Sequence, residues 1–346
     1  MNTKIVNKRN LGIVGALFTL LLAVGYFNYF TSNTTFTEAE VYIKIPTGST
    51  FDQVKAILKP YVKNTNHFET MAALRSYPEH VKPGRYLFKK GMNSFAMVTS
   101  LRHTIPVKLA FNNQERLEDF AGRVGSQIEA DSLSLLRVFK DTTFLKVNGF
   151  SEENVFAILI PNTYEMYWNT SAEKFRDKML KEYQKFWNAD RVLKAKNQNL
   201  TPIEATILAS IVHKESVKKD ERPKIAAVYL NRLKLEMPLQ ADPTVIYALK
   251  KQSGDFTKII KRVLPEDLKI NSPYNTYSKV GLPPAPIAMP DITALEAVLQ
   301  PDKNDFLFFC ASVDRFGYHE FAKTFAEHVI IANKYRKWIN EQGVNR

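Results

Sequence analysis

An apolar stretch with helical spacing occupies residues 203–216, where the chain reads IEATILASIVHKES. Thr201 precedes it as a candidate N-cap, and Pro202 suits the first helical position. Glu204 follows the cap by three residues and completes a capping box. Few positions in this stretch are polar, so the pattern predicts a buried helix of roughly 14 residues.

The apolar face of this predicted helix ends in a carboxylate. Leu208, Ile211 and Glu215 recur at helical spacing, so Glu215 continues the face that the two aliphatic residues begin. A carboxyl group in apolar surroundings is hard to ionise, which raises its pKa and suits it to act as a general acid near neutral pH. The alternative is an ordinary solvated helix end, in which Lys214 or Lys218 pairs with this carboxylate.

The longest apolar run lies near the N-terminus. Residues 11–30 carry no charge and match the length needed to cross a bilayer. Basic residues precede the run and aromatic residues end it: Lys4, Lys8, Arg9, Tyr26, Phe27, Tyr29 and Phe30. The segment that follows, YFTSNTTF, has no signal-peptidase site and no Cys for a lipid anchor. We expect a cytoplasmic tail at 1–10, a single transmembrane anchor at 11–31, and the remainder on the periplasmic or extracytoplasmic side of the cytoplasmic (inner) membrane.

A small α+β unit is predicted over 41–104. A strand leads to a turn at Gly48 and a helix capped by Ser49 or Thr50. A second helix near 66–76, a strand at 85–88 and a helix from Ser94 complete the unit. Its size suits a binding module better than a catalytic one.

A larger mixed α+β domain is predicted over 105–346, so the fold class is α+β. It begins with a strand at 105–113 and closes with a helix at 292–299, two strands and a helix at 325–341. Thr170, Asp220 and Asp242 are the predicted N-caps of successive helices between them. Residues 272–290 hold five prolines and no helical period, and a long ordered loop of this kind is usually functional.

Composition narrows the classes of function. The single Cys, Cys310, excludes an internal disulfide, and no two of the six His stand at the i, i+4 spacing of a metal site, so no metal is expected. The net charge is +13, of which +10 remains outside the N-terminal tail. Nucleic acid is the usual partner of such a charge, but the predicted topology favours an anionic membrane surface or cell-envelope polymer.

Four phrases taken in series resemble the endolytic murein transglycosylases, the MltG/YceG-like family. They are ILASIVHKES, ERPKIAAVYLNRLKLEMPLQADPTVIYAL, SPYNTYSKVGLPPAPI and FFCASVDRFGYHEF, and the weaker PNTY at 161–164 also fits. The most specific are LQADPTVIY and YNTY followed by GLPP. The segment 41–104 resembles the LysM-like glycan-binding module of that family, and 105–346 its YceG-like catalytic domain.

The resemblance implies a lyase that cleaves peptidoglycan strands between N-acetylmuramic acid (MurNAc) and N-acetylglucosamine (GlcNAc). The product end would be 1,6-anhydroMurNAc, which terminates elongation of nascent strands. The phrase that carries the family's catalytic Glu makes that residue Glu215. The reaction needs no cofactor, and the family's association with penicillin-binding synthases of the elongation and division machinery makes these the expected protein partners.

Matching phrases also suggest residues that line the glycan groove. Amides and hydroxyls there would hold acetamido groups, and tyrosines would stack on sugar faces. The expected substrate-binding residues are Gln240, Asp242, Thr244, Tyr247, Tyr274, Asn275, Thr276 and Tyr277. For Asn231 and Arg232, a role in helix packing is as consistent with the sequence as substrate contact. For His319, a structural or orienting hydrogen bond is expected.

The chain departs from the family pattern at three places. His213 stands where many relatives have a second Glu, Phe156-Ala157 replaces a usual Glu-Gly, and Ala285 replaces a common Gly. Two other functions remain open from the sequence. One is a glycan-binding protein without activity, and the other is a hydrolase in which Asp220, Glu221 or Asp242 assists Glu215, since glycoside hydrolysis ordinarily uses two carboxylates.

Overall fold

The computed structural model describes residues 8–341 of the chain. Two compact units share these residues. The first runs to Leu109 and includes 127–129 and 165–170, and the second holds the rest. Helices and three small two-stranded sheets make up the fold, so the α+β class is confirmed.

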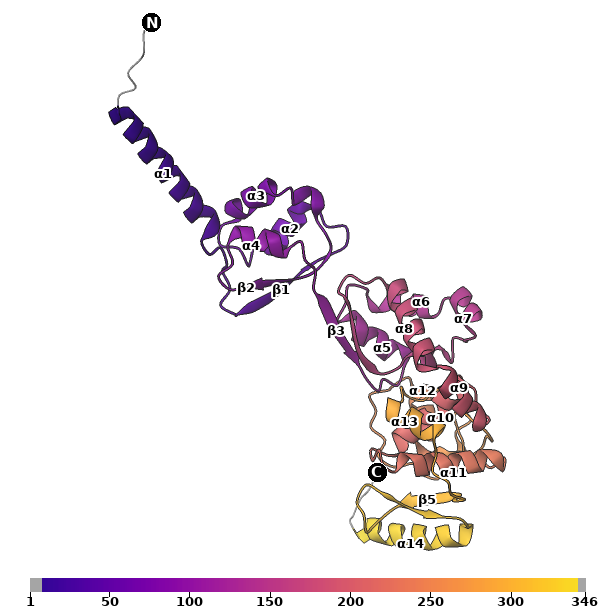
Figure 1. The fold of residues 1–346 in the computed structure, drawn as a ribbon. Coiled ribbons are helices and arrows are strands. Elements are labelled where there is room, and N and C mark those ends of the chain that lie inside the picture. Colours follow the sequence, from indigo (N-terminus) through magenta and orange to yellow (C-terminus); the bar gives the residue numbers. More distant parts are fainter. Residues whose placement is uncertain (1–7, 342–346) are drawn as a thin grey trace. The chain divides into compact units, whose positions relative to one another are not determined.

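The first unit carries a β-helix-helix-β arrangement (Figure 1). Its elements are α1 (Lys8–Phe30), β1 (Glu40–Ile45), α2 (Phe51–Leu58), α3 (Thr65–Leu74), a 3₁₀ turn (Pro78–His80), β2 (Gly84–Lys89) and α4 (Ser94–Ser100). The strands β1 and β2 pair antiparallel, with Ile43 opposite Tyr86. Alternate residues of each strand are buried, so α2, α3 and α4 cover one face of the sheet.

The helix α1 begins the described chain. Its large apolar side chains are exposed over much of its length, including Val14 at 62% and Leu21 at 70%. Among residues 8–341, none of the helices combines the length and apolar character that a membrane crossing requires.

The second unit is mainly helical. Its elements are α5 (Leu117–Gly125), α6 (Ser132–Phe139), α7 (Thr142–Asn148), α8 (Ala172–Phe186), α9 (Ala189–Asn197), α10 (Pro202–Glu215), α11 (Arg222–Lys234), α12 (Asp242–Ser253), α13 (Ile292–Leu299), β5 (Phe308–Ala311), β6 (His319–Ala322) and α14 (Phe325–Glu341), with 3₁₀ turns at Val155–Ile158 and Asp267–Lys269. The strands β3 (Pro106–Phe111) and β4 (Asn162–Tyr167), each of which has residues in both units, pair with each other.

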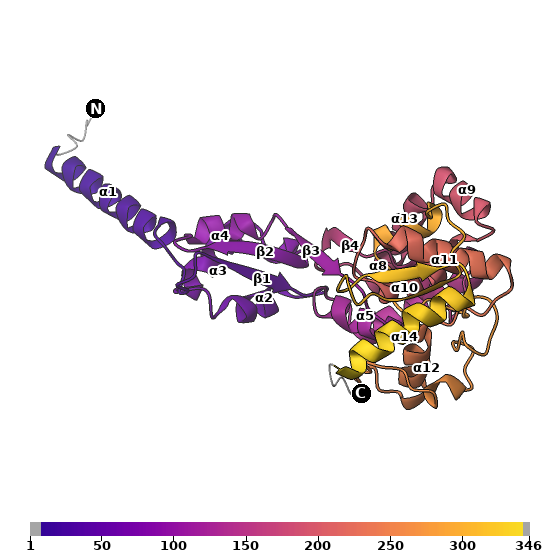
Figure 2. The same cartoon turned by 90° about the horizontal axis from the view of Figure 1, so that it is seen from below.

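The helix α10 lies at the centre of the second unit. It packs against α11, α12 and α13, and residues 205–212 are all buried. The antiparallel pair β5–β6 and the helix α14 lie beside one another at the end of the chain (Figures 1 and 2). The predicted buried helix is therefore confirmed, and it forms part of the main hydrophobic core.

The observed N-cap residues agree with some of the predicted ones and differ from others. Thr201 caps α10 with the predicted capping box, and Thr50 caps α2. The other three predicted caps are wrong. Ser171 rather than Thr170 caps α8, Glu221 rather than Asp220 precedes α11, and Ala241 rather than Asp242 precedes α12.

Candidate active site

Glu215 is the last residue of α10 and lies in the wall of a cavity. The chain turns to an extended conformation at Ser216, so the helix ends directly after the carboxylate. The cavity has a volume of about 410 Å³ and is formed by parts of the second unit alone. Its polar lining includes Glu215, Tyr229, Arg232, Gln240, Asp242, Tyr277, His319 and His328. This arrangement places the carboxyl group of Glu215 beside a second carboxyl group, that of Asp242, and several hydrogen-bonding groups.

The surroundings of Glu215 favour the neutral form of its carboxyl group, which persists to higher pH than in an exposed Glu. Burial, and next the negative charge of Asp242, raise the pKa of Glu215 to about 7. His319 and the Tyr229 hydroxyl act in the opposite direction. The position at a helix C-terminus also disfavours a negative charge. A carboxyl group with such a pKa can give up a proton near neutral pH and take one back.

Asp242 and Gln240 reach the same cavity from the segment before α12. The Tyr277 hydroxyl donates to Asp242 Oδ1 at 2.5 Å, which joins the predicted loop 272–290 to the start of the helix. Burial raises the pKa of Asp242, and this hydrogen bond lowers it in part. Gln240 has a left-handed backbone (φ +53°), and its side-chain oxygen accepts from Arg232 at 3.2 Å. Gln240, Asp242 and Tyr277 are thus brought together with Glu215.

Three other predicted groove residues are buried and do not line this cavity. Thr244 and Thr276 share a hydrogen bond of 2.8 Å, and Thr276 Oγ1 accepts from the Ala241 backbone amide at 3.0 Å. The side-chain amide of Asn275 donates to the carbonyls of Leu268 and Ile270 at 2.8 and 2.9 Å. The Thr276 contacts fix the loop 272–290 against the start of α12, beside Asp242, and the Asn275 contacts fix it to the segment 268–270.

Tyr247 and Tyr274 lie at a second cavity of about 640 Å³. Their ring centroids are 4.8 Å apart, and the Tyr274 hydroxyl donates to Glu153 Oε1 at 3.2 Å. Phe156, one of the departures from the family pattern, lines the same cavity. Five of the groove residues predicted from the sequence therefore divide between two cavities, and the other three are buried and line neither.

Two further residues lie on the wall of the Glu215 cavity, Tyr229 on α11 and His319 on β6. Tyr229 is 1% exposed, and its hydroxyl has no hydrogen-bond partner among the described residues. For His319 the sequence suggests a structural or orienting hydrogen bond. Its Nδ1 and its backbone amide both bond to Glu221 at 2.8 Å, so a buried carboxylate fixes the orientation of the ring. His328, also on the cavity wall, was not singled out, and its Nδ1 has no partner among the described residues. Sequence pattern gives no signal for such unpaired atoms.

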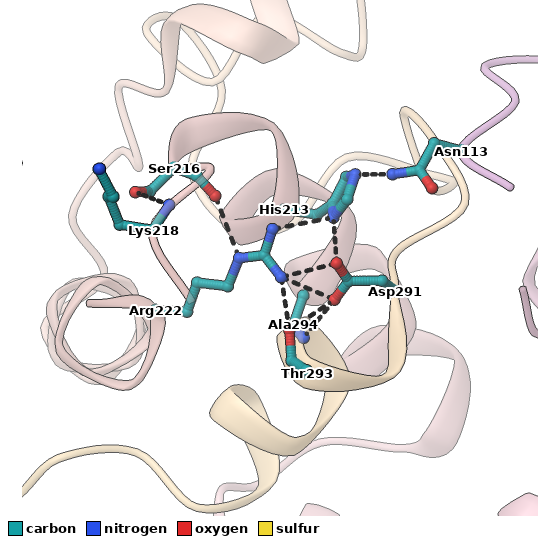
Figure 3. Close-up of polar contacts among 8 residues, drawn as sticks. All are labelled: Asn113, His213, Ser216, Lys218, Arg222, Asp291, Thr293 and Ala294. Carbon is teal, nitrogen blue, oxygen red and sulfur yellow. Dashed lines mark hydrogen bonds and ion pairs between the residues drawn. The ribbon is translucent and has the colours of Figure 1, made fainter. Parts of the chain in front are cut away.

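A buried ion pair holds the end of α10. Figure 3 shows His213 and Arg222 pointing toward Asp291. Arg222 Nη1 donates to both carboxylate oxygens of Asp291 at 2.7 and 2.8 Å, and Arg222 Nε donates to the Ser216 carbonyl at 3.0 Å. His213 also contacts Asn113. His213, which departs from the family pattern, therefore belongs to this network and is not among the residues that line the Glu215 cavity.

The described residues hold no group of three or more His, Cys, Asp or Glu side chains arranged to bind a metal ion. Cys310 lines the Glu215 cavity, where burial raises the pKa of its thiol. A raised thiol pKa opposes formation of the nucleophilic thiolate.

Comparison with known proteins gives one consistent result. The model of the YceG-like family matches residues 43–334. A protein of Bacillus subtilis named endolytic murein transglycosylase is 31% identical, over 87% of this chain and 86% of its own length. A Streptococcus pneumoniae protein of the same name is 28% identical, over 85% of this chain but 59% of its own length. The crystal structure of a YceG-like protein from Listeria monocytogenes superposes with a TM-score of 0.56 at 27% identity, covering 85% of this chain and 99% of that one.

Proposed function

The chain belongs to the YceG-like family, and we propose that it is a lytic transglycosylase that cuts peptidoglycan glycan strands internally, between MurNAc and GlcNAc. The observation that supports this best is Glu215, whose carboxyl group has a pKa of about 7 and lies in a cavity lined by hydrogen-bonding groups. The names of the relatives support the substrate.

The proposed reaction uses Glu215 twice. Its protonated carboxyl gives a proton to the glycosidic oxygen as the bond to the MurNAc anomeric carbon breaks, and GlcNAc leaves with a free hydroxyl. The MurNAc C6 hydroxyl then forms a bond to the same anomeric carbon, and the Glu215 carboxylate accepts the hydroxyl proton. The product is a 1,6-anhydro end, and the acid is regenerated. Because the nucleophile belongs to the same sugar, proximity replaces a second catalytic carboxylate.

Gln240, Asp242 and Tyr277 are the predicted groove residues that line the Glu215 cavity, and we assign them to substrate contact there. Thr244, Asn275 and Thr276 support them by holding the loop. Tyr247 and Tyr274 would contact more distant parts of the strand, at the second cavity.

A hydrolase is the second candidate, because Asp242 shares the cavity with Glu215. The other two carboxylates considered from the sequence have different partners. Asp220 accepts from the Tyr318 hydroxyl at 3.1 Å, and Glu221 binds His319. Asp242 is therefore the carboxylate that a hydrolytic mechanism would use to activate water.

The two candidates give different products. Full-length chain in detergent would be incubated with uncleaved glycan strands, and the ends of the fragments identified by mass spectrometry. We expect anhydro ends from the wild type and from Glu266→Gln, a matched change at an exposed loop position, and none from Glu215→Gln. Reducing MurNAc ends would indicate the hydrolase. Strands bound but uncut would leave a binding protein.

Localisation and partners are further parts of the proposal. Residues 11–30 would anchor the chain in the cytoplasmic membrane, with the N-terminus inside, since the run is uncharged, basic residues precede it, and many of the described apolar side chains of α1 are exposed. The β1–α2–α3–β2 unit would serve as a LysM-like glycan-binding module, and penicillin-binding synthases would be protein partners. Release of the chain from membranes by alkaline carbonate would refute the anchor, and failure to co-purify with such synthases would refute the partnership.

A further inference from the structure

The Tyr229 hydroxyl is a buried polar group without a partner. The residue is 1% exposed, and its ring packs edge-on against Phe309 with centroids 5.7 Å apart. No described residue forms a hydrogen bond with the hydroxyl oxygen. Buried hydroxyl groups are nearly always paired, because an unpaired one loses its hydrogen bonds to water without replacement. On the wall of the Glu215 cavity, such a hydroxyl is free to donate to a neighbouring acceptor.

The nearest candidate partner is the Glu215 carboxyl group. Tyr229 lines the same cavity and lies close enough to Glu215 to lower its pKa, although the two groups do not reach ordinary hydrogen-bond geometry. Burial, and next the charge of Glu215, hold the pKa of Tyr229 well above its usual value, so this hydroxyl keeps its proton and acts as a donor. The two residues are also held in register, since Arg222 at the start of α11 bonds to the Ser216 carbonyl after α10.

Three other polar groups on the cavity wall, those of Tyr277, His319 and Arg232, have hydrogen-bond partners other than Glu215. From the loop 272–290, Tyr277 donates to Asp242 at the start of α12. From β6, His319 is bonded through Nδ1 to Glu221. From α11, Arg232 donates to backbone carbonyls and to Gln240. From α14, burial and next the positive charges of two arginines lower the pKa of His328. Tyr335 on α14 and Cys310 on β5 complete the titratable lining.

We propose that Tyr229 is a positioning residue for Glu215: its hydroxyl donates a hydrogen bond to the carboxylate that Glu215 becomes on releasing its proton. The inference rests on the proposed function of Glu215 as the acid. A neutral carboxyl group accepts only a weak hydrogen bond from the hydroxyl, whereas a carboxylate accepts a shorter and stronger charge-assisted one. The contact therefore tightens as the proton leaves, and it stabilises the transition state more than the resting enzyme.

The test is Tyr229→Phe in the full-length chain. The variant keeps the ring and removes the hydroxyl, so its thermal stability should equal or exceed that of the wild type. We expect kcat on glycan strands to fall about 10- to 100-fold with KM within about twofold, the range for losing a hydrogen bond to a charged group. Since the hydroxyl lowers the pKa of Glu215, the alkaline limb of the pH–rate profile should move to higher pH. Unchanged kcat, or a loss with the limb unmoved, would overturn the proposal.

Direct titration of Glu215 separates this proposal from the proposed function. Infrared difference spectra between each protein and its Glu215→Gln derivative report the carboxyl band of Glu215 whether or not the chain cuts glycan. Tyr229→Phe should raise the pKa read from this band. Tyr77→Phe is the matched control, because Tyr77 is also fully buried with an unpaired hydroxyl but lies in the first unit. It should leave the Glu215 band unchanged. If Tyr229→Phe shifts the titration of the Glu215 band but the wild type cuts no glycan, the proposed function is refuted and the contact stands. If Tyr229→Phe leaves the titration unshifted, the contact is refuted.

Discussion

Replacing Arg222 with Met should destabilise the second unit and displace Glu215. The Arg222 side chain is 3% exposed and the Asp291 side chain 28% exposed, so the pair is largely removed from water. Removing one partner of a fully buried pair costs about 3–5 kcal/mol, because the other charge is left unpaired. The partial exposure of Asp291 reduces this, and we expect a loss of roughly 2–4 kcal/mol in the free energy of unfolding.

A double-mutant cycle isolates the pair itself. Asp291 is also the N-cap of α13, where Oδ1 accepts from the Ala294 amide at 3.0 Å. Asn caps helices nearly as well as Asp, so Asp291→Asn removes the charge and keeps the cap. Calorimetry or denaturant unfolding of Arg222→Met, Asp291→Asn and the double variant should give a coupling energy of about 2 kcal/mol. A coupling energy below roughly 0.5 kcal/mol would refute the reasoning, because the effects of mutations at independent sites add to within that margin.

The pH dependence of this pair has a definite sign. Burial opposes ionisation of Asp291, but hydrogen bonds from His213, Arg222, Thr293 and the Ala294 amide outweigh it and hold its pKa well below the usual range. A carboxyl group with a depressed pKa contributes stability above its unfolded pKa of about 3.9, and this is lost as pH falls through the folded value. The difference in stability between wild type and Arg222→Met should therefore be largest near neutral pH and shrink in acid.

Three further predictions concern the same helix and cavity. Thr201→Ala should reduce the free energy of unfolding by about 1 kcal/mol, because it removes the cap of α10, while Thr201→Ser should restore it; equal stability of the two would contradict the assigned cap. Asp242→Asn removes a negative charge that raises the pKa of Glu215, so the alkaline limb of the pH–rate profile should move down by roughly one pH unit with anhydro products retained; loss of product would favour the hydrolase. Glu215 has a raised folded pKa of about 7, so its contribution to stability is present below its unfolded pKa and is lost as pH rises. Relative to Glu215→Gln, the wild type should lose on the order of 2 kcal/mol between about pH 4.5 and 7.5, and parallel stability curves would contradict the shift.

The sequence was most informative where local signals agreed. The capping box at Thr201 and Glu204 and the apolar run that follows predicted α10 with its observed bounds, Pro202–Glu215. Each signal in that segment concerns residues within a few positions of one another, and the apolar face is stable only when it is buried in the core. Placement of Glu215 at the end of the buried face followed from the same spacing.

The failed caps show what local signals leave out. Asp220 and Asp242 are both good N-cap residues, but each carboxylate accepts a hydrogen bond from a tyrosine far along the chain, Tyr318 and Tyr277 respectively. A long-range partner thus takes the side chain that the local pattern assigned to the helix end. The groove residues divide for a similar reason. Buried backbone groups need hydrogen-bond partners, and Asn275 and Thr276 supply them to the segments beside the loop, at Ile270 and Ala241.

The C-terminal end of α10 carries Glu215, whose charged form is unfavourable there, and Arg222, which stabilises that end. A carboxylate at a helix C-terminus is electrostatically unfavourable, which helps to keep Glu215 protonated near neutral pH. The carbonyls at such an end lack helical partners, and Arg222 supplies both a donor and a positive charge to the Ser216 carbonyl. Asp291 in turn fixes Arg222 from the start of α13. Stability contributed by this ion pair therefore maintains the acid in a position that is unfavourable for its charged form.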